Sequence, residues 1–423
     1  MGPSIIFDKS ALQSFSVDET VWLDRFFMGN ITPLFYVETL ADLEKKVREG
    51  QTAESVVGLI AAKSPPGAVP NVHHQTMILQ ELAGAPHLLI DTRPVLAGGV
   101  AKRTPEGKTA IDFDGFPEAE ALDRWRSGDF LDVERGVARS WRAALASHDV
   151  EREVAMAANL LPTGSKVSNL AQLKNTIDQV CLKADKHLLD LLMELLDIPG
   201  PGRPKIQQRW VDAASPVDLS VFAPYSTHVF KVNLLYLLGV ARGFISGERA
   251  SNQADMAYLY YLPFCMVFTS GDGLHNRTVP LFLGERQLFI PAKDLKEALS
   301  GLDAHFDALP DSVKQMGVMR FAGYPPSTLD NEVSRCWDLL MRPDWRDIAR
   351  QQEKRLLDPD YPDTPPESAA ELNAMHAAST PMTEDGAAEL GLDDADMVFV
   401  KKSMPLRRGK WTMLPPSITG EAS

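Results

Sequence analysis

Short apolar runs that lead into an acidic residue mark the N-terminal part of the chain. Residues 4–7 (SIIF) form such a run and are followed by Asp8, which predicts a short buried strand. Apolar residues then recur at helical spacing over 21–27, which predicts a helix. A second apolar run, 33–37, leads into Glu38, after which leucine and valine repeat at helical spacing. We therefore expect strand, helix, short strand and helix over the first fifty residues.

Helical periodicity dominates the middle of the chain. A Pro-containing loop at 62–71 precedes a segment of helical spacing at 73–82, and the run 87–91 predicts another short strand. The leucine-rich stretch 151–197 and the apolar stretch 229–245 predict further helices. No internal repeat is present, so a repeat architecture is not expected.

The stretch from 251 to 282 combines a helical and a strand pattern. Asp255 opens a short helical segment that Pro263 ends. Residues 265–270 have the β-branched and aromatic bias of a buried strand, and this run leads directly into Asp272. The order of elements predicts an α/β fold with a parallel sheet.

Composition and charge narrow the class of protein. The 423 residues include 44% hydrophobic and 24% charged side chains, a normal globular mixture. No apolar run approaches the roughly 20 residues of a membrane span, so no membrane contact is expected. The N-terminus lacks a secretory pattern, and the three cysteines are widely spaced. We therefore expect a reducing, cytoplasmic location.

The formal net charge of −14 is unevenly distributed. Residues 357–396 carry −11 without a single lysine or arginine, whereas 397–423 carry +4. The acidic stretch predicts a flexible, partly disordered segment, and residues 397–400 predict one late strand. The remaining residues, 1–356, carry a net charge of −7, which gives no sign of a broad nucleic-acid-binding face. A local basic groove would still be compatible with this average.

Four acidic residues are predicted near the carboxyl ends of the strands, where parallel sheets bind their ligands. Asp8 and Asp272 follow predicted strands, and Glu38 and Asp255 stand at predicted helix starts. Ligands of open α/β sheets bind beyond the carboxyl ends of the strands. A divalent cation would relieve the repulsion between clustered carboxylates, and oxygen ligands favour Mg²⁺ or Mn²⁺. Alternatively, each acid is a helix cap or a turn residue.

The ordered context of these acids resembles the PIN-domain family of metal-dependent nucleases. The resemblance rests on Ile5 to Ser10 (IIFDKS), on Glu38, and on the block D-x(3)-L-x(2)-L-P-x(4)-F-x-S-x-D between Asp255 and Asp272. It covers about a quarter of the chain. The interval between Glu38 and Asp255 is much longer than in this family, which implies a large insertion.

The resemblance implies hydrolysis of phosphodiester bonds, most often in RNA, with toxin-like and defence roles frequent in the family. Asp8, Glu38, Asp255 and Asp272 would be catalytic and would hold one or two Mg²⁺ or Mn²⁺ ions. Ser270 would orient an acid or a metal-bound water. The residues expected to contact substrate phosphate are His275 and Arg277. Because carboxylates repel, replacing Asp8 or Asp272 with Asn is expected to raise the melting temperature of the metal-free protein.

The resemblance also implies a division of the chain. Residues 1–95 and 246–330 would form a PIN-like parallel-sheet core, and 96–245 a mainly helical insertion. Residues 331–423 would be a C-terminal extension containing the acidic stretch. The insertion would shape substrate access or bind a protein partner.

Two other functions compete with the nuclease. A haloacid-dehalogenase-type phosphatase would also use an aspartate after the first strand, but that family needs a second aspartate where this chain has Ser10. A catalytically silent PIN-like binding or regulatory module would have no need of clustered carboxylates. No GxxxxGK[ST] or GxGxxG pattern is present, so nucleotide hydrolysis and dinucleotide chemistry have no support.

The remaining candidates have simpler explanations. His73 and His74 are expected to start a helix rather than to bind zinc. Asp91, at the end of a predicted strand, is a candidate fifth acid. The tyrosines at 258, 260 and 261 would either stack on bases or form a buried aromatic stripe.

Overall fold

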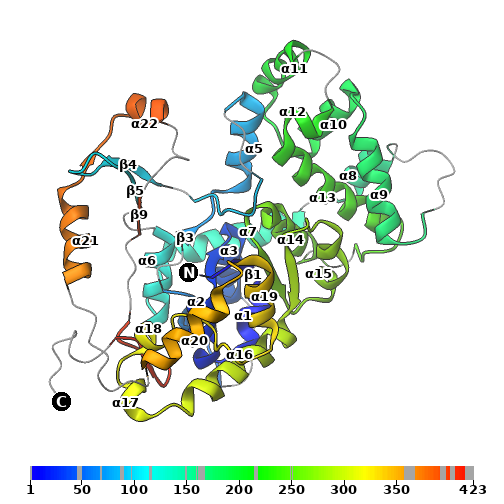
Figure 1. Cartoon of the computed structure of the whole chain (residues 1–423). Helices are drawn as coiled ribbons and strands as arrows, with labels where there is room; N and C mark the ends of the chain where they lie inside the picture. Colours follow the sequence, from blue (N-terminus) through cyan, green and yellow to red (C-terminus); the bar gives the residue numbers. More distant parts are fainter. Residues whose placement is uncertain are drawn as a thin grey trace.

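A five-stranded parallel sheet lies at the centre of the computed structural model (Figure 1). The structure describes residues 2–44, 50–66, 69–85, 90–96, 98–113, 117–147, 150–158, 160, 167–213, 218–247, 249, 251–356, 367–390, 397–400 and 405–414. The strands of the central sheet are β1 (Ser4–Phe7), β2 (Met28–Ile31), β3 (Val69–Pro70), β6 (Val267–Ser270) and β7 (Leu288–Pro291). Their order is β3-β2-β1-β6-β7, with every neighbouring pair parallel. The predicted α/β class with a parallel sheet is therefore confirmed.

Alternation along β1 and β6 separates two hydrophobic cores. Ile5, Phe7 and Val267 belong to the core on one face of the sheet, whereas Ile6 and Phe268 belong to the core on the other. Successive side chains of a strand point to opposite faces. A parallel sheet covered on both faces needs apolar side chains at every position, which explains the continuous apolar runs in the sequence.

The first core combines N-terminal and C-terminal helices. Trp22 stacks on Phe306 with ring centroids 4.4 Å apart, which ties the two parts of the chain together. Its helices are α1 (Lys9–Ser14), α2 (Val17–Phe26), α3 (Pro33–Ala41), α4 (Ala53–Lys63), α6 (Pro117–Arg126), α7 (Asp132–Ser147), α16 (Ala292–Asp307), α17 (Asp311–Lys314), α18 (Val318–Phe321), α19 (Glu332–Leu340) and α20 (Trp345–Leu356), with the short η1 (Asp42–Glu44).

The second core contains most of the predicted insertion, and its helices form the green lobe above the sheet in Figure 1. Its central helix, α13 (Pro224–Ala241), is buried on most sides. The other helical elements on this side are α5 (His74–Ala83), α8 (Val150–Ala158), α9 (Leu170–Cys181), α10 (Lys186–Leu195), η2 (Gly200–Gly202), α11 (Arg203–Asp212), α12 (Leu219–Phe222), α14 (Ser251–Tyr258), η3 (Leu259–Phe264), α15 (Gly273–Thr278) and η4 (Val279–Leu281). The helices predicted over 151–197 and 229–245 are present with shifted ends, whereas α6 and α7 of the insertion pack in the first core.

The C-terminal part contributes to a second, four-stranded sheet. Its strands are β4 (Val100–Arg103), β5 (Thr109–Phe113), β8 (Thr380–Pro381) and β9 (Met397–Val400), in the order β8-β4-β5-β9. The acidic stretch also contains regular structure. It forms α21 (Glu367–Ala378), β8 and α22 (Glu384–Leu390), and Nε2 of His376 lies 3.1 Å from Oδ2 of Asp112 in β5. Residues 357–366 and 391–396 lie outside the described residues.

One predicted strand needs correction, and a second lies mostly outside the described residues. The run 33–37 is the start of α3, because Thr32 caps that helix and Pro33 takes its first position, and the strand is β2 instead. The strand predicted at 87–91 falls mostly on residues outside the described ones. Asp91 is exposed and paired with Arg93. The next residue, Thr92, accepts a hydrogen bond from Ser4, which lies at the end of β1 opposite to Asp8. Asp91 is therefore not a fifth acid of the site.

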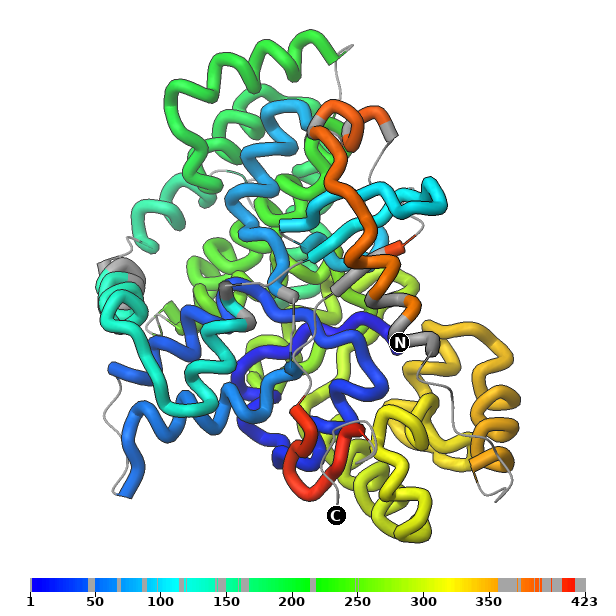
Figure 2. Tube along the Cα trace, turned by 90° about the vertical axis from the view of Figure 1, so that its left-hand side faces the viewer, coloured from blue at the N-terminus to red at the C-terminus, as the bar shows by residue number. Residues whose placement is uncertain are grey.

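A C-terminal hairpin of β10 (Arg407–Arg408) and β11 (Trp411–Thr412) lies against α2; it is the red turn of Figure 2. The buried Arg408 donates to the backbone oxygens of Lys63 (2.7 Å) and Ser64 (3.1 Å). Burial lowers the pKa of Arg408 to about 10. Thus the basic residues counted near the C-terminus are not all available to an anionic partner.

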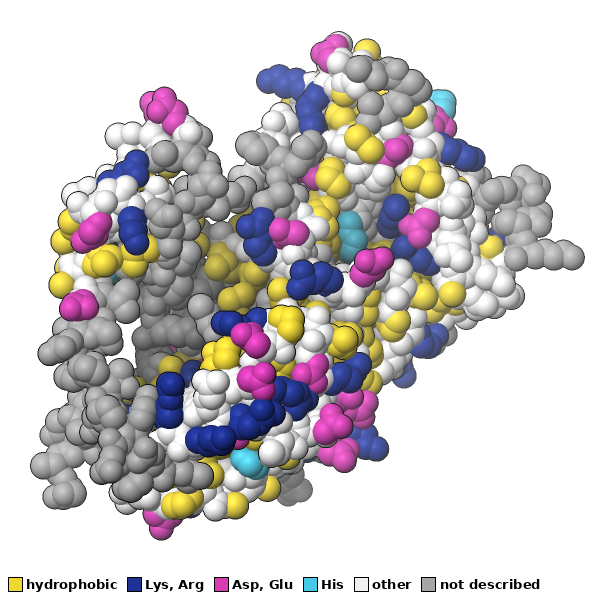
Figure 3. All heavy atoms as spheres, in the orientation of Figure 1, with side chains coloured by type: hydrophobic (Ala, Val, Ile, Leu, Met, Phe, Trp, Pro, Cys, Tyr) yellow, Lys and Arg dark blue, Asp and Glu magenta, His cyan; other side chains and the backbone are white. Residues whose placement is uncertain are grey.

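Mixed charge characterises the face drawn in Figure 3, where lysine and arginine side chains lie among acidic ones. No helix in the described part of the chain is both long and apolar enough to cross a membrane.

We expect Trp411→Ala to destabilise the protein by about 3–5 kcal/mol, the usual cost of truncating a large buried aromatic side chain. Trp411 is buried against Trp22, and Asp303 accepts hydrogen bonds from both indoles at 2.8 and 3.0 Å. Urea unfolding measures the change, with the exposed Leu406→Ala as the control. A loss below about 1 kcal/mol would show that the hairpin is not part of the core.

Candidate functional site

Strands β1 and β6 end side by side at the point where the chain reverses its direction across the sheet. From β1 the chain proceeds outward through β2 and β3, and it returns on the other side of β1 with β6. Phe7 pairs with Thr269, so Asp8 and Ser270 follow at the same edge. Crevices at such switch points are the usual ligand sites of open α/β sheets.

Asp8 lies in a closed hydrogen-bond network at this edge. It caps α1 by accepting from the backbone N–H of Ala11 (2.8 Å), and it also accepts from the hydroxyls of Ser10 (2.8 Å) and Ser270 (2.6 Å). Burial works to raise the pKa of Asp8, yet the hydrogen bond and the charge of His275, with the bonds from Ser270 and Ala11, bring it below its ordinary value. Asp8 is therefore ionised at neutral pH.

His275 supplies the positive charge that this carboxylate needs. The ring is fully buried; Nδ1 lies 2.7 Å from the Ser270 hydroxyl and 3.3 Å from Oδ2 of Asp8, and Nε2 lies 2.7 Å from the backbone oxygen of Asp255. Burial opposes protonation, but the hydrogen bond and charge of Asp8 raise the pKa of His275 to about 9. His275 was predicted to contact substrate phosphate. That prediction was wrong, because the ring is fully buried and its two nitrogens lie against the Ser270 hydroxyl and the backbone oxygen of Asp255.

Glu38 and Asp255 approach the same edge from two helices. Glu38 is in the middle of α3, and its Oε2 accepts a 2.5 Å hydrogen bond from the hydroxyl of Tyr258 on α14. Asp255 is in the middle of α14. Both acids were predicted at helix starts, but each helix begins about a turn earlier, because Thr32 and Pro33 start α3 and α14 begins at Ser251.

The pKa shifts of these acids show that they interact electrostatically. Burial, opposed by the charge of His275 and assisted by the negative charges of Glu38, Asp272 and Asp8, raises the pKa of Asp255 to about 7. Burial likewise raises the pKa of Glu38. The four predicted acids therefore lie close enough for their charges to interact. We call them the acid tetrad (Asp8, Glu38, Asp255 and Asp272).

The tetrad is not arranged as a finished metal site. Among the described residues, no three His, Cys, Asp or Glu side chains are grouped so that they could hold an ion. Asp272 is committed to capping α15, where Oδ1 accepts from the Leu274 N–H at 2.5 Å. The all-oxygen donor set nevertheless suits Mg²⁺ or Mn²⁺, and the raised pKa values of Asp255 and Glu38 mark negative charge that a cation would stabilise.

A cavity of about 490 Å³ opens beside Asp272. Two cationic side chains line it, Arg249 and Arg277. Arg277 is exposed and donates to the backbone oxygen of Phe244 at 3.0 Å. Of the two predicted phosphate contacts, only Arg277 is therefore placed where a phosphate group could reach it.

Sequence reasoning missed three members of the network. Tyr258 was weighed only as a base-stacking or core residue, but it bonds Glu38. Lys9 donates to the backbone oxygen of Glu38 at 3.3 Å, and Ser10 to Asp8. Their positions directly after Asp8 in the first turn of α1 were the available signal. His73 caps α5 and His74 follows it, so the prediction that they start a helix is confirmed.

Comparison of the chain with protein-family models, with curated proteins and with solved structures found no match in any of the three.

We expect opposite effects from neutralising Asp255 and Asp8 in the metal-free protein. Asp255→Asn should raise the free energy of unfolding by at least about 1 kcal/mol at pH 8, because it removes a carboxylate whose ionised form is disfavoured. The gain should shrink at pH 4, where Asp255 is protonated. Asp8→Asn should destabilise instead, which corrects the melting-temperature increase expected from sequence for Asp8. Urea unfolding in EDTA measures both, and equal effects of the two variants would contradict the network.

The Asp8–His275 contact predicts a loss of stability on the alkaline side. A histidine whose pKa is raised to about 9 stabilises the fold fully below about pH 6.5, and this contribution is lost as the pH rises toward 9. We expect the free energy of unfolding to fall by a few kcal/mol over that window, and to fall much less in His275→Gln. His305→Gln, on α16 in the first core, is the matched control. Parallel pH profiles for wild type and His275→Gln would contradict this assignment.

Proposed function

We propose that this protein is a Mg²⁺- or Mn²⁺-dependent nuclease that hydrolyses phosphodiester bonds, with RNA as its expected substrate. The observation that carries the proposal is that the structure brings Asp8, Glu38, Asp255 and Asp272 to one edge of the sheet, where the charges of the other three acids add to burial in raising the pKa of Asp255. Mutually repelling buried carboxylates cost stability, and perturbed groups of this kind cluster at functional sites. The RNA substrate and a toxin-like or defence role rest on the PIN-like resemblance alone.

The acid tetrad would hold the metal. Once bound, the ion would lower the pKa of a coordinated water and stabilise negative charge on the phosphoryl group. Ser270 and His275 act on the protein side, since they hold the carboxylate of Asp8 in place and keep it ionised. Arg249 and Arg277 lie beside Asp272, where they would bind a neighbouring phosphate.

The silent binding module is the second candidate, and one observation favours it. His275 already neutralises Asp8, and the described residues contain no ready group of metal ligands. Mn²⁺ should raise the melting temperature of a nuclease and leave that of a silent module unchanged. The phosphatase stays less favoured, because the carboxylate of Asp8 accepts three hydrogen bonds and Ser10 replaces the second acid.

We expect Asp255→Asn to retain the fold and to lose at least about 100-fold in metal-dependent cleavage, since a neutral amide is a poor Mg²⁺ ligand. The assay uses pooled RNA and single-stranded DNA with Mn²⁺ or with EDTA. Glu285→Gln, an exposed acid ahead of β7, is the control and should keep full activity. Cleavage that persists in EDTA, or full activity in Asp255→Asn, would refute the nuclease.

A further inference from the structure

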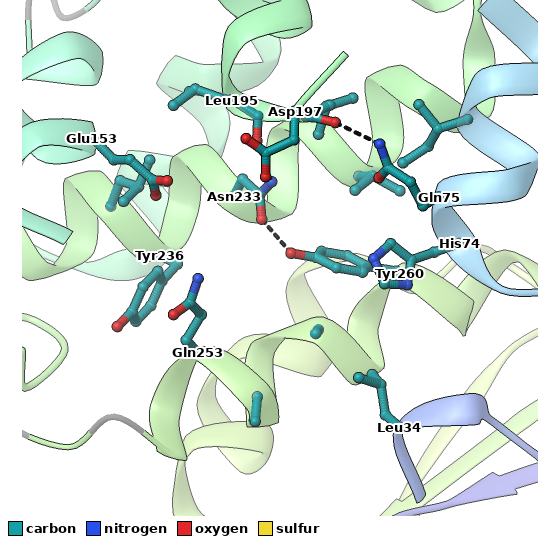
Figure 4. Close-up of a pocket in the computed structure, with 16 residues that line it drawn as sticks. Leu34, His74, Gln75, Glu153, Leu195, Asp197, Asn233, Tyr236, Gln253 and Tyr260 are labelled. Atoms are coloured by element: carbon teal, nitrogen blue, oxygen red, sulfur yellow. Dashed lines mark hydrogen bonds between the residues drawn. The ribbon is translucent and has the colours of Figure 1, made fainter. Parts of the chain in front are cut away.

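Figure 4 shows a second cavity, of about 210 Å³. Helix α5, helices α8, α10 and α13 of the predicted insertion, and the α14–η3 segment line it. It is smaller than the roughly 300–1,000 Å³ pockets that take drug-sized ligands. A single planar heterocycle is the kind of group that this volume suits.

The cavity shares its walls with the tetrad. On α3, Leu34 lines the cavity and Glu38 belongs to the tetrad, and residues four apart lie on the same face of a helix. On α14, Ala254 lines the cavity and directly precedes Asp255, which is not itself part of the lining. A group bound here would therefore be a near neighbour of the proposed reaction centre.

The lining supplies an aromatic surface without positive charge. Tyr260 lies beside His74 with ring centroids 5.1 Å apart. Burial lowers the pKa of His74 to about 3, so this ring is neutral at pH 7. The hydroxyl of Tyr260 donates to Oδ1 of Asn233 and thereby fixes the amide. No lysine or arginine among the described residues lines the cavity, so a phosphate group is disfavoured here.

The carboxylate of Asp197 gives the cavity a preference for hydrogen-bond donors. Glu153 and Asp197 line it, and Figure 4 shows Asp197 beside Asn233. Asp197 has a left-handed backbone (φ 51°) just after α10, where the N–H of Ile198 bonds to the oxygen of Met193. Glycine or asparagine is favoured at such a helix end. An aspartate there costs backbone strain and places a carboxylate at the cavity, a combination typical of functional positions.

We propose that this cavity binds one unpaired nucleobase of the substrate, with guanine preferred over the other bases. This inference rests on the proposed nuclease function, because the base would belong to the strand whose phosphate lies at the tetrad. Guanine presents adjacent N–H donors on its Watson–Crick edge, which a carboxylate can accept, and uracil lacks an amino group. Aromatic side chains supply stacking that any base can use. The helical insertion would thus provide base recognition, and Arg249 and Arg277 would bind phosphate in the separate cavity beside Asp272.

Calorimetric titration of the full chain with each of four ribonucleosides, in EDTA, tests the proposal. We expect guanosine to bind at least about tenfold more tightly than cytidine or uridine. Asp197→Asn should weaken guanosine binding about tenfold while retaining the left-handed backbone, which asparagine tolerates. Leu34→Trp should fill the cavity and abolish binding. Glu285→Gln is again the control, with unchanged affinity expected.

The outcomes separate the cavity from the nuclease. Equal affinity for all four nucleosides, no binding, or unchanged guanosine binding in Asp197→Asn would overturn the base site, even if the chain cleaves RNA. Guanosine binding that depends on Asp197 would support the base site even if no cleavage is found, because the titration contains neither metal nor phosphate.

Discussion

The ionic contact between Asp8 and His275 is the interaction on which the site depends. Both side chains are buried, and an isolated charge in such a place would cost several kcal/mol. Ser270 lies between them and bonds to both, so the ends of β1 and β6 are held by one network. Because His275 also bonds to the backbone of Asp255, the same contact fixes α14 against the sheet. This contact therefore helps to place Asp255 near Asp8.

The two cavities near the Asp8–His275 contact differ in the charge of the side chains that line them. The cavity with Arg249 and Arg277 lies beside Asp272, and the aromatic, anionic cavity is lined by other residues of α3 and α14, the helices that carry Glu38 and Asp255. The sheet alone does not provide this arrangement. The aromatic cavity needs α8, α10 and α13, which the chain inserts between the second and third acids. The insertion therefore supplies walls of this cavity, which a simple spacer would not do.

Local patterns predicted those parts of the fold that local physics determines. The strand 4–7, the strand ending at Ser270 and the acids that follow them could be predicted, because a buried parallel strand is a continuous apolar run. The burial of His275 could not be predicted, since it depends on Asp8, more than 260 residues away. Nor could the pairing of β5 with β9, which joins the middle of the chain to the strand that follows the acidic stretch. Both contacts join residues that lie far apart in the sequence, and local patterns do not show which distant residues will meet.

The most direct test of the account is proton release on Mn²⁺ binding, measured by calorimetry at pH 7 in two buffers of different ionisation enthalpy. Asp255, with a pKa of about 7, is partly protonated in the metal-free protein. A cation bound by the tetrad would displace that proton, because metal ligands must be deprotonated. We predict binding with net proton release, and weaker binding without that release in Asp255→Asn. Absence of Mn²⁺ binding, or binding that releases no proton and is unchanged in Asp255→Asn, would contradict a shared metal site.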